Sequence, residues 1–469
     1  TELLRGLGTP EGAQAAGLYG FRLLSPGDDP SKLVFSFTLF ERGEGVNRLR
    51  VQTDNWDQPF DINEGARLDL GSTAKLRTLV TYLELVAELH ERWNSLDGIA
   101  LAALELHERD HIGRWARDYL LRASDRGLQP MLDAAMQRKY SASPGEGFFT
   151  GGGLHFFANF EPGDNGKIMP VAEALRHSVN LPFIRLMRDV VWHVMYNLPS
   201  ADPALFKDPD NPQRREYLMR FADKEGQAYL LRFWRKYQGK DWTQVRETLL
   251  QGVRETAPKL TAVFRTIEPR AGMQDLSDFL LQQLQEEMPN YTDKELRKLY
   301  DTYDPQRMSL ADRGYVASVH PLELWLAGWL RDHPDGTFAE AVQASTQERQ
   351  DVYAWLFKTK HKGAQDVRIR NLLEIEAFIE IHRRWKRLGY PFESLTPSYA
   401  SALGASGDRP AALAEFMGIL ANDGLRQSTA RIDELHFAEN TPYETRLTLR
   451  GNPPERVLPP EVAATARRA

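Results

Sequence analysis

The spacing of hydrophobic residues divides the chain into regions of different predicted structure. Apolar runs over residues 21–52, separated by a Pro-Gly-Asp-Asp turn and by Gly43–Gly45, predict strands of an antiparallel meander. The next region is predicted to be an amphipathic helix, because apolar residues recur there at helical spacing, namely Leu76, Leu79, Val80, Leu83 and Val86. The first part of the chain therefore predicts strands followed by a strongly apolar helix.

Further helices are predicted over residues 98–140 and 170–192. The segment between them, 141–169, is rich in Gly, Pro, Phe and Asn and predicts an irregular loop. Residues 1–20 are rich in Gly and Ala and predict a short helix or linker. The order of elements in this half is thus strands, helices, a loop and a further helix.

From about residue 200 to 388, one helical pattern follows another with almost no strand signal. Tryptophans in this stretch predict a helical core of its own, and they are Trp234, Trp242, Trp325, Trp329, Trp355 and Trp385. The mixed pattern then returns, with a predicted helix at 410–422 and strand-like runs at 430–437 and 446–450. Strands at both ends predict a single sheet built from both ends, interrupted by an all-α insertion.

Composition narrows the function classes. The 469 residues exceed what one core usually needs, and the net charge of −6, with both signs interspersed, argues against a nucleic-acid surface. The chain has no cysteine, which excludes disulfides, cysteine nucleophiles and thiolate metal sites. We find no apolar run of about 18 residues, so we expect no membrane span here. The chain begins at Thr1 without methionine, and we expect an upstream region.

Ser72 and Lys75 are the first candidate catalytic residues. Ser-x-x-Lys places a hydroxyl and an amine on the same side of the first turn of the predicted helix. A buried amine has a lowered pKa and can accept the serine proton, which is the arrangement of a nucleophile beside its own base. Free backbone N–H groups at the helix start suit an oxyanion. The alternative is an ordinary helix cap on a solvated helix.

Ser178 and Asn180 form a second candidate motif. In His177-Ser178-Val179-Asn180 a hydroxyl and a carboxamide stand two residues apart near the start of a predicted helix. They suit a proton relay and an amide that holds a peptide backbone. A helix cap is again the alternative.

Together these motifs resemble the transpeptidase domain of class A penicillin-binding proteins, a superfamily with Ser-x-x-Lys, Ser-x-Asn and Lys-Thr-Gly motifs. The resemblance covers about 20–190 and 395–469. Its further matches, in order, are Phe60-Asp61-Ile62-Asn63 before the first motif, Phe157-Ala158-Asn159-Phe160 with 166–175, Thr396-Pro397-Ser398 with Ala402-Leu403-Gly404, Ile419–Gly424, and Val457–Ala463.

The resemblance implies an α+β fold of the penicillin-binding-protein and β-lactamase type, an antiparallel sheet flanked by helices with an inserted all-α subdomain. It implies a core over 1–191 and 395–469 and an insertion at 192–394. Ser72 would be acylated by a D-Ala-D-Ala stem peptide or a penicillin, Lys75 would take its proton, Ser178 would relay that proton, and Asn180 would hold the substrate. Serine acyl transfer needs no metal or organic cofactor.

The resemblance also implies an enzyme of peptidoglycan synthesis on the periplasmic side of the inner membrane, with its anchor and a glycosyltransferase domain outside these residues. Its expected partners are stem peptides, β-lactam antibiotics and, through the insertion, cell-wall assembly proteins; nucleic acid is not expected. The chain departs from the pattern because no Lys-Thr-Gly follows Gly424. We expect that motif beyond Ala469 or absent from the protein.

Three alternatives stay open. A β-lactamase or penicillin sensor uses the same serine chemistry. A non-catalytic scaffold of cell-wall assembly agrees with the missing third motif. His107-Glu108-Arg109-Asp110-His111 matches the His-Glu-x-x-His zinc pattern, but its charged centre and flanks favour a solvated face over a metal site.

Overall fold

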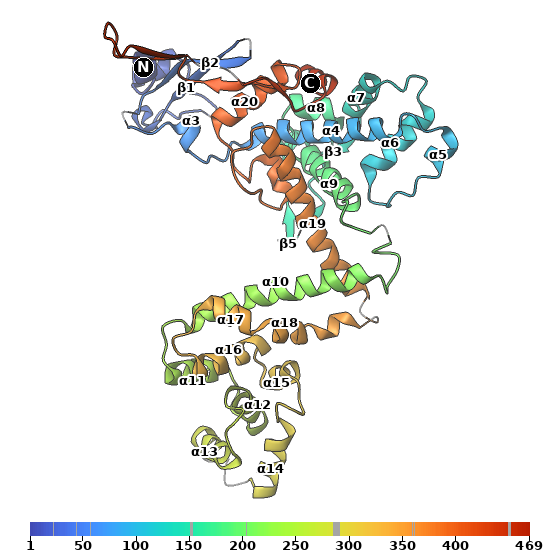
Figure 1. The fold of residues 1–469 in the computed structure, drawn as a ribbon, viewed down its shortest axis with the longest axis vertical. Coiled ribbons are helices and arrows are strands. Elements are labelled where there is room, and N and C mark those ends of the chain that lie inside the picture. Colours follow the sequence, from blue (N-terminus) through green and yellow to red (C-terminus); the bar gives the residue numbers. More distant parts are fainter. Residues whose placement is uncertain are drawn as a thin grey trace. The chain divides into compact units, whose positions relative to one another are not determined.

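The computed structural model describes residues 1–21, 23–43, 45–56, 58–150, 153–202, 204–284, 291–358, 360, 362–448 and 452–469. The chain forms two compact units (Figure 1). The first unit comprises 1–199 and 373–469, and the second comprises 200–372. Each unit is described by itself below.

The boundaries of the insertion differ from the predicted 192–394. Helix α9 (Asn180–Tyr196) continues past residue 191, and helix α19 (Lys362–Arg387) contributes its residues from Leu373 onward to the first unit. Trp385 on α19, which we expected in the core of the insertion, is instead buried in the first unit and donates a hydrogen bond from Nε1 to Thr81 Oγ1 at 3.0 Å. Helical periodicity crosses both boundaries, so it does not mark where one core ends and the other begins.

The main sheet of the first unit combines strands from both ends of the chain. Strand β1 (Ser36–Arg42) pairs antiparallel with β2 (Val46–Asp54), and β8 (Ser428–Ala430) pairs with the other edge of β2. The pairing between β2 and β8 is parallel, with Val46 opposite Ser428, so this sheet is mixed and not purely antiparallel as expected.

Four two-stranded antiparallel pairs complete the strands of the first unit in the described residues. They are β3 (Lys139–Ser141) with β6 (Ile168–Pro170), β4 (Gly147–Thr150) with β5 (Gly153–Phe156), β7 (Leu425–Arg426) with β11 (Glu455–Arg456), and β9 (Glu434–Phe437) with β10 (Thr445–Thr448). The segment 141–169, predicted to be an irregular loop, therefore contains the β4–β5 pair and β6. Burial alternates along β4, where Phe148 and Thr150 are buried and Phe149 is exposed, but the adjacent phenylalanines and the glycines do not show this alternation in the sequence.

Helix α4 (Ala74–Trp93) crosses the first unit (Figure 1). It packs against α6 (His111–Arg122), α7 (Leu128–Met136), α9 and α21 (Pro460–Arg468), so the apolar side chains that predicted this helix are fully buried, except for Leu76, which is partly buried. The remaining α-helices of this unit are α1 (Glu2–Leu7), α2 (Pro10–Ala15), α3 (Ile62–Gly65), α5 (Gly98–Ala102), α8 (Val171–Arg176) and α20 (Pro410–Ala421). Short 3₁₀ turns lie at Pro30–Lys32, Gly71–Thr73, Pro162–Asp164 and Tyr399–Leu403.

A buried ion pair ties α4 to the C-terminal part of the first unit. Arg77 Nε lies 2.6 Å from Asp408 Oδ2, and both side chains are buried. Arg77 also donates to the carbonyl oxygen of Leu388 at 3.2 Å, and its guanidinium lies 4.9 Å from the ring centre of Phe416. The charge is thus matched by an acid and by hydrogen bonds, which a buried arginine requires.

The second unit is helical throughout its described residues. Its helices are α10 (Pro212–Tyr237), α11 (Trp242–Leu250), α12 (Ala257–Ile267), α13 (Met273–Leu284), α14 (Asp293–Thr302), α15 (Leu310–Ala317), α16 (Pro321–Asp332), α17 (Phe338–Ala344), α18 (Thr346–Val352), a 3₁₀ turn at Ala354–Phe357 and the start of α19. The tryptophans Trp234, Trp242, Trp325 and Trp329 pack against one core, whereas Trp355 is 41% exposed. In the part of the chain that the structure describes, no helix combines the length and the apolar character needed to cross a bilayer.

Candidate active site

The side-chain amine of Lys75 is the centre of a group of four residues, Ser72, Lys75, Ser178 and Asn180, called here the Lys75 site. Nζ of Lys75 lies 2.9 Å from Ser72 Oγ, 3.0 Å from Ser178 Oγ and 2.8 Å from Asn180 Oδ1. It also lies 2.6 Å from the backbone carbonyl oxygen of Ser178. The structure therefore brings together all four residues that the sequence suggested, from two segments about a hundred residues apart.

Ser72 is exposed in a 3₁₀ turn (Gly71–Thr73) that leads directly into α4. The turn begins at Gly71, whose φ of 57° is in the left-handed region that favours glycine. The backbone N–H of Ser72 donates to no other group in the described residues. A free N–H at the start of a 20-residue helix is suited to an oxyanion formed next to the Ser72 hydroxyl.

Ser178 lies at a break between two helices. Helix α8 ends at Arg176, and α9 begins at Asn180. Ser178 has a φ of 53°, which non-glycine residues rarely adopt. Two backbone hydrogen bonds, from Ser178 N to Leu175 O at 2.9 Å and from Val179 N to Ala174 O at 2.9 Å, close this turn. The break lets one residue present both its carbonyl and its hydroxyl to Lys75.

Asn159 fixes the segment beside the break. Its Oδ1 accepts a hydrogen bond from Leu181 N at 3.0 Å, and its Nδ2 donates to Ala142 O at 2.7 Å. Asn180 Nδ2 donates to Ala158 O at 3.1 Å, so the adjoining residue also contacts the Lys75 site. Asn159 therefore connects the start of α9 to the segment after β5.

Gly404 supports the Ser72 turn from the other side. It ends the 3₁₀ turn Tyr399–Leu403 with a φ of 92°. A Cβ added there would lie 2.7 Å from Gly71 N and 2.9 Å from both Gly71 O and Asp69 Oδ1. Only a residue without a side chain fits here. The close contact between Gly404 and Gly71 holds the C-terminal part of the unit against the Ser72 turn.

Lys75 has electrostatic surroundings unlike those of a surface lysine. It is only 1% exposed, and burial lowers its pKa from 10.5 to about 8. All four of its hydrogen-bond acceptors are neutral, and none of the groups contacting Ser72 or Lys75 in the described residues is a carboxylate. Its amine is therefore neutral in a useful fraction of molecules near neutral pH, and it can accept the proton of Ser72 or Ser178.

The His107–His111 zinc pattern does not form the helical pair of histidines that a zinc protease uses, since α6 begins only at His111. The ring of His107 stacks on Tyr196 at 3.5 Å, and His111 Nδ1 lies 3.0 Å from Asp189 Oδ1. Nor is the segment the solvated face that we expected, since Asp110 is buried and hydrogen-bonded to His193 at 2.8 Å. Among the described residues, no group of three or more His, Cys, Asp and Glu side chains is placed to hold a metal ion.

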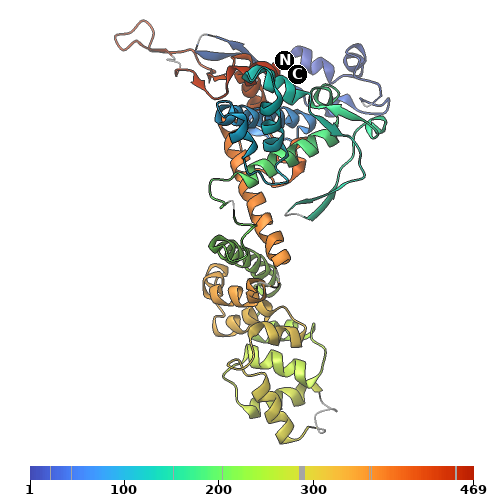
Figure 2. The same ribbon diagram turned by 90° about the vertical axis from the view of Figure 1, so that its right-hand side faces the viewer.

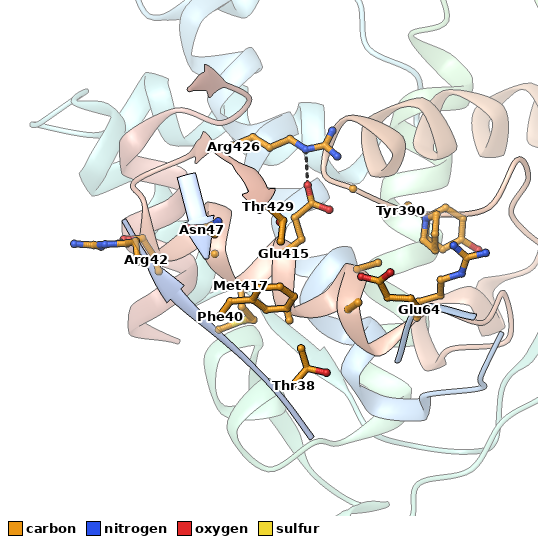
Figure 3. A pocket seen from close by; sticks show the side chains of 18 of the residues that line it. Thr38, Phe40, Arg42, Asn47, Glu64, Tyr390, Glu415, Met417, Arg426 and Thr429 are labelled. Atoms are coloured by element: carbon orange, nitrogen blue, oxygen red, sulfur yellow. Dashed lines mark hydrogen bonds and ion pairs between the residues drawn. The ribbon is translucent and has the colours of Figure 1, made fainter. Parts of the chain in front are cut away.

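A separate cavity of about 1020 Å³ lies between the inner face of the main sheet and α20 (Figure 3). Thr38 and Phe40 on β1 face Met417 on α20 across it, and the ion pair between Arg426 and Glu415 lies at its edge. The four residues of the Lys75 site are not among its lining residues. The cavity therefore supplies no group to the serine and lysine chemistry.

The sequence motifs identified the groups that meet at Lys75 but not the residues that position them. Asn159 and Gly404 belong to stretches that resemble the transpeptidase family, yet no local pattern indicated their contacts. The residue pairs Asn159–Leu181 and Gly404–Gly71 are distant in sequence, so a local reading cannot find them. Comparisons with protein-family models, with curated proteins and with solved structures find no match to this chain.

Proposed function

We propose that this chain is the transpeptidase part of a penicillin-binding protein, a serine acyltransferase that acts on D-Ala-D-Ala stem peptides and crosslinks peptidoglycan. The observation that carries the proposal is the placement of Lys75 Nζ within 3.0 Å of the hydroxyls of Ser72 and Ser178 and of the carboxamide of Asn180. A lysine buried among neutral acceptors has no ion-pair partner among them, and its lowered pKa suits the role of a base for a serine nucleophile.

In the proposed reaction, the neutral amine of Lys75 accepts the proton of Ser72 as Oγ attacks the carbonyl carbon of the penultimate D-Ala. The backbone N–H of Ser72 donates to the oxyanion. The C–N bond then breaks, and the proton passes from Lys75 through the Ser178 hydroxyl to the nitrogen of the departing D-Ala. An ester on Ser72 remains. An acceptor amine attacks that ester and loses a proton to the Ser178–Lys75 pair. The ester C–O bond then breaks, the acyl group leaves as a new amide, and Lys75 returns the proton to Ser72 Oγ.

The same contacts favour a transpeptidase over a β-lactamase. Rapid hydrolysis of an acyl-enzyme needs a base that activates water, and a carboxylate is one means of doing so. The contacts of Ser72 and Lys75 in the described residues include no carboxylate. A penicillin adduct on Ser72 is therefore expected to persist.

The second unit is proposed to bind proteins of cell-wall assembly. It has a core of its own, and Tyr315 on α15 is 87% exposed. We propose, with the same assignment, a location on the periplasmic side of the inner membrane.

Intact-mass measurement of the full-length protein after incubation with benzylpenicillin tests the proposal. We expect a gain of one penicilloyl group that peptide mapping assigns to Ser72, and loss of the gain in Ser72→Ala. Ser309→Ala is the matched control, because Ser309 also begins a helix but lies away from any such lysine. A folded protein that gains no mass contradicts the proposal and supports the scaffold alternative; rapid release of hydrolysed penicillin supports the β-lactamase alternative.

A further inference from the structure

A row of apolar side chains runs beside the Lys75 site. It begins in β5 and continues through the residues that follow as far as a bend at Phe160. Its members are exposed while the residues between them are partly buried, and they are Leu154, Phe156, Ala158 and Phe160, called here the apolar row. Phe156 is 69% exposed and Phe160 is 67% exposed, although large apolar side chains of a folded unit are usually covered. The β4–β5 pair that carries the start of the row extends away from the helices of its unit (Figure 2).

The alternation along this segment explains why the apolar row faces solvent. Successive side chains of an extended chain point to opposite sides. Phe157 points inward, where its ring meets that of Phe148 at 5.5 Å, and Asn159 points inward to Ala142 and Leu181. These two inward anchors fix Ala158 between them with its side chain outward, and Phe156 and Phe160 on either side of the anchors are exposed as well.

Asn180 links the apolar row to the nucleophile. Its Oδ1 contacts Lys75, and its Nδ2 donates one hydrogen to the carbonyl of Ala158 in the middle of the row. A carboxamide nitrogen carries two hydrogens, so one remains for a ligand. An acyl donor whose amide carbonyl accepts that hydrogen would have its scissile carbonyl on the Ser72 side of Asn180 and its next group beside Ala158.

We infer that the apolar row is the wall of this site that selects the acyl donor, and that it favours donors carrying a bulky apolar or aromatic group next to the amide carbonyl bound by Asn180. The inference rests on the proposed acyl transfer at Ser72. Phe156 and Phe160 lie two residues to either side of Ala158 and both are exposed, so each offers an aromatic ring for such a group.

Two penicillins that differ only in this group test the inference. Benzylpenicillin places a benzyl group beyond the side-chain amide carbonyl, and 6-acetamidopenicillanic acid keeps that carbonyl but carries a methyl group instead. The second-order rate constant for acylation of Ser72 in the full-length protein is measured with each compound. We expect benzylpenicillin to react faster, and Phe156→Ser and Phe160→Ser each to lower the ratio of the two rate constants by about tenfold, as loss of most of one aromatic contact implies.

Ile99→Ser is the control variant, because Ile99 is 83% exposed on α5 and outside the apolar row. It should leave the ratio unchanged. If the two phenylalanine variants lower both rate constants equally, or leave the ratio as in the unaltered protein, the inference is wrong while acyl transfer stands. If neither compound acylates the unaltered protein, the proposed function itself fails.

Discussion

The amine of Lys75 lies 2.6 Å from the carbonyl oxygen of Ser178, although 103 positions separate the two residues. The carbonyl oxygen of Ser178 can only accept a hydrogen bond, whereas the hydroxyl of Ser178 can either donate or accept one. Lys75 is therefore held in place in both of its protonation states by the carbonyl, and the hydroxyls of Ser72 and Ser178 remain available for proton transfer. One residue in the left-handed conformation provides both functions, which links the backbone break between α8 and α9 to the proposed chemistry.

The lowered pKa of Lys75 predicts how acylation depends on pH. Burial brings this pKa to about 8, and only the neutral amine accepts the proton of Ser72. We expect the rate constant for acylation by benzylpenicillin to rise about tenfold per pH unit below that pKa and to level off above it. Stopped-flow or quenched acylation between pH 6 and 10 measures this. A rate that is constant between pH 6 and 8 would show that neutral Lys75 is not the base.

The same pKa predicts a change in stability with pH. In the unfolded chain Lys75 titrates near 10.5, so between about pH 8 and 10.5 the unfolded state binds a proton that the folded state has lost. The contribution of Lys75 to the free energy of unfolding therefore rises with pH across this window. Comparing urea unfolding of the protein and of Lys75→Met at pH 8 and pH 10 measures it. The slope should be smaller in Lys75→Met, and equal slopes would contradict the assignment.

Removal of the Ser178 hydroxyl separates proton relay from positioning. Ser178→Ala keeps the backbone carbonyl that holds Lys75, so we expect the fold to persist and acylation of Ser72 to slow by about a hundredfold or more, as loss of a general acid–base group typically does. Ser143→Ala is a suitable control, since Ser143 lies in the same unit and, among the described residues, its Oγ accepts a hydrogen bond from Gly145 N alone. Acylation of Ser178→Ala at the rate of the unaltered protein would exclude the relay.

Features set by neighbouring residues could be predicted from the sequence, whereas features set by contacts between residues far apart in the sequence could not. Helical spacing predicts α4, and the two short motifs name every hydrogen-bond partner of the Lys75 amine in the described residues, because each motif is local. The positions of Asn159 and Gly404 depend on contacts with residues far along the chain. No periodicity encodes such contacts, so they appear only in the structure.

The incorrect expectations have physical causes of the same kind. Trp385 was assigned to the insertion because α19 has one continuous helical pattern, yet its C-terminal part packs in the first unit. Asp110 was expected in solvent because its neighbours are charged, but in the interior its Oδ1 accepts a hydrogen bond from Nδ1 of His193, which lies 83 positions away. A polar residue can be buried whenever a distant partner satisfies it.

Gly404 predicts a strong effect of one methyl group near the nucleophile. In Gly404→Ala the new Cβ would overlap backbone atoms of Gly71, and the φ of 92° would be strained for alanine. We expect a loss of about 1–3 kcal/mol in the free energy of unfolding. The Ser72 turn would be displaced, so acylation should slow as well. Gly163→Ala, where a Cβ meets nothing within 4 Å, is the control and should change neither quantity. Normal acylation by Gly404→Ala would show that this contact does not position Ser72.

The two compact units predict two separate thermal transitions, and buried arginines in each provide the means to assign them. Arg77 pairs with Asp408 in the first unit, and Arg265 pairs with Asp304 in the second. Removing one partner leaves an uncompensated charge, which in a buried pair typically costs about 3–5 kcal/mol. We therefore expect Arg77→Met to lower the midpoint of one transition in scanning calorimetry and Arg265→Met to lower the midpoint of the other. The effect should be smaller for Arg265, because Asp304 is more exposed than Asp408.

Replacing Asp408 by Asn in the Arg77→Met background removes the unpaired charge and should recover part of the lost stability. If either single variant shifts both transitions equally, the two units unfold as one.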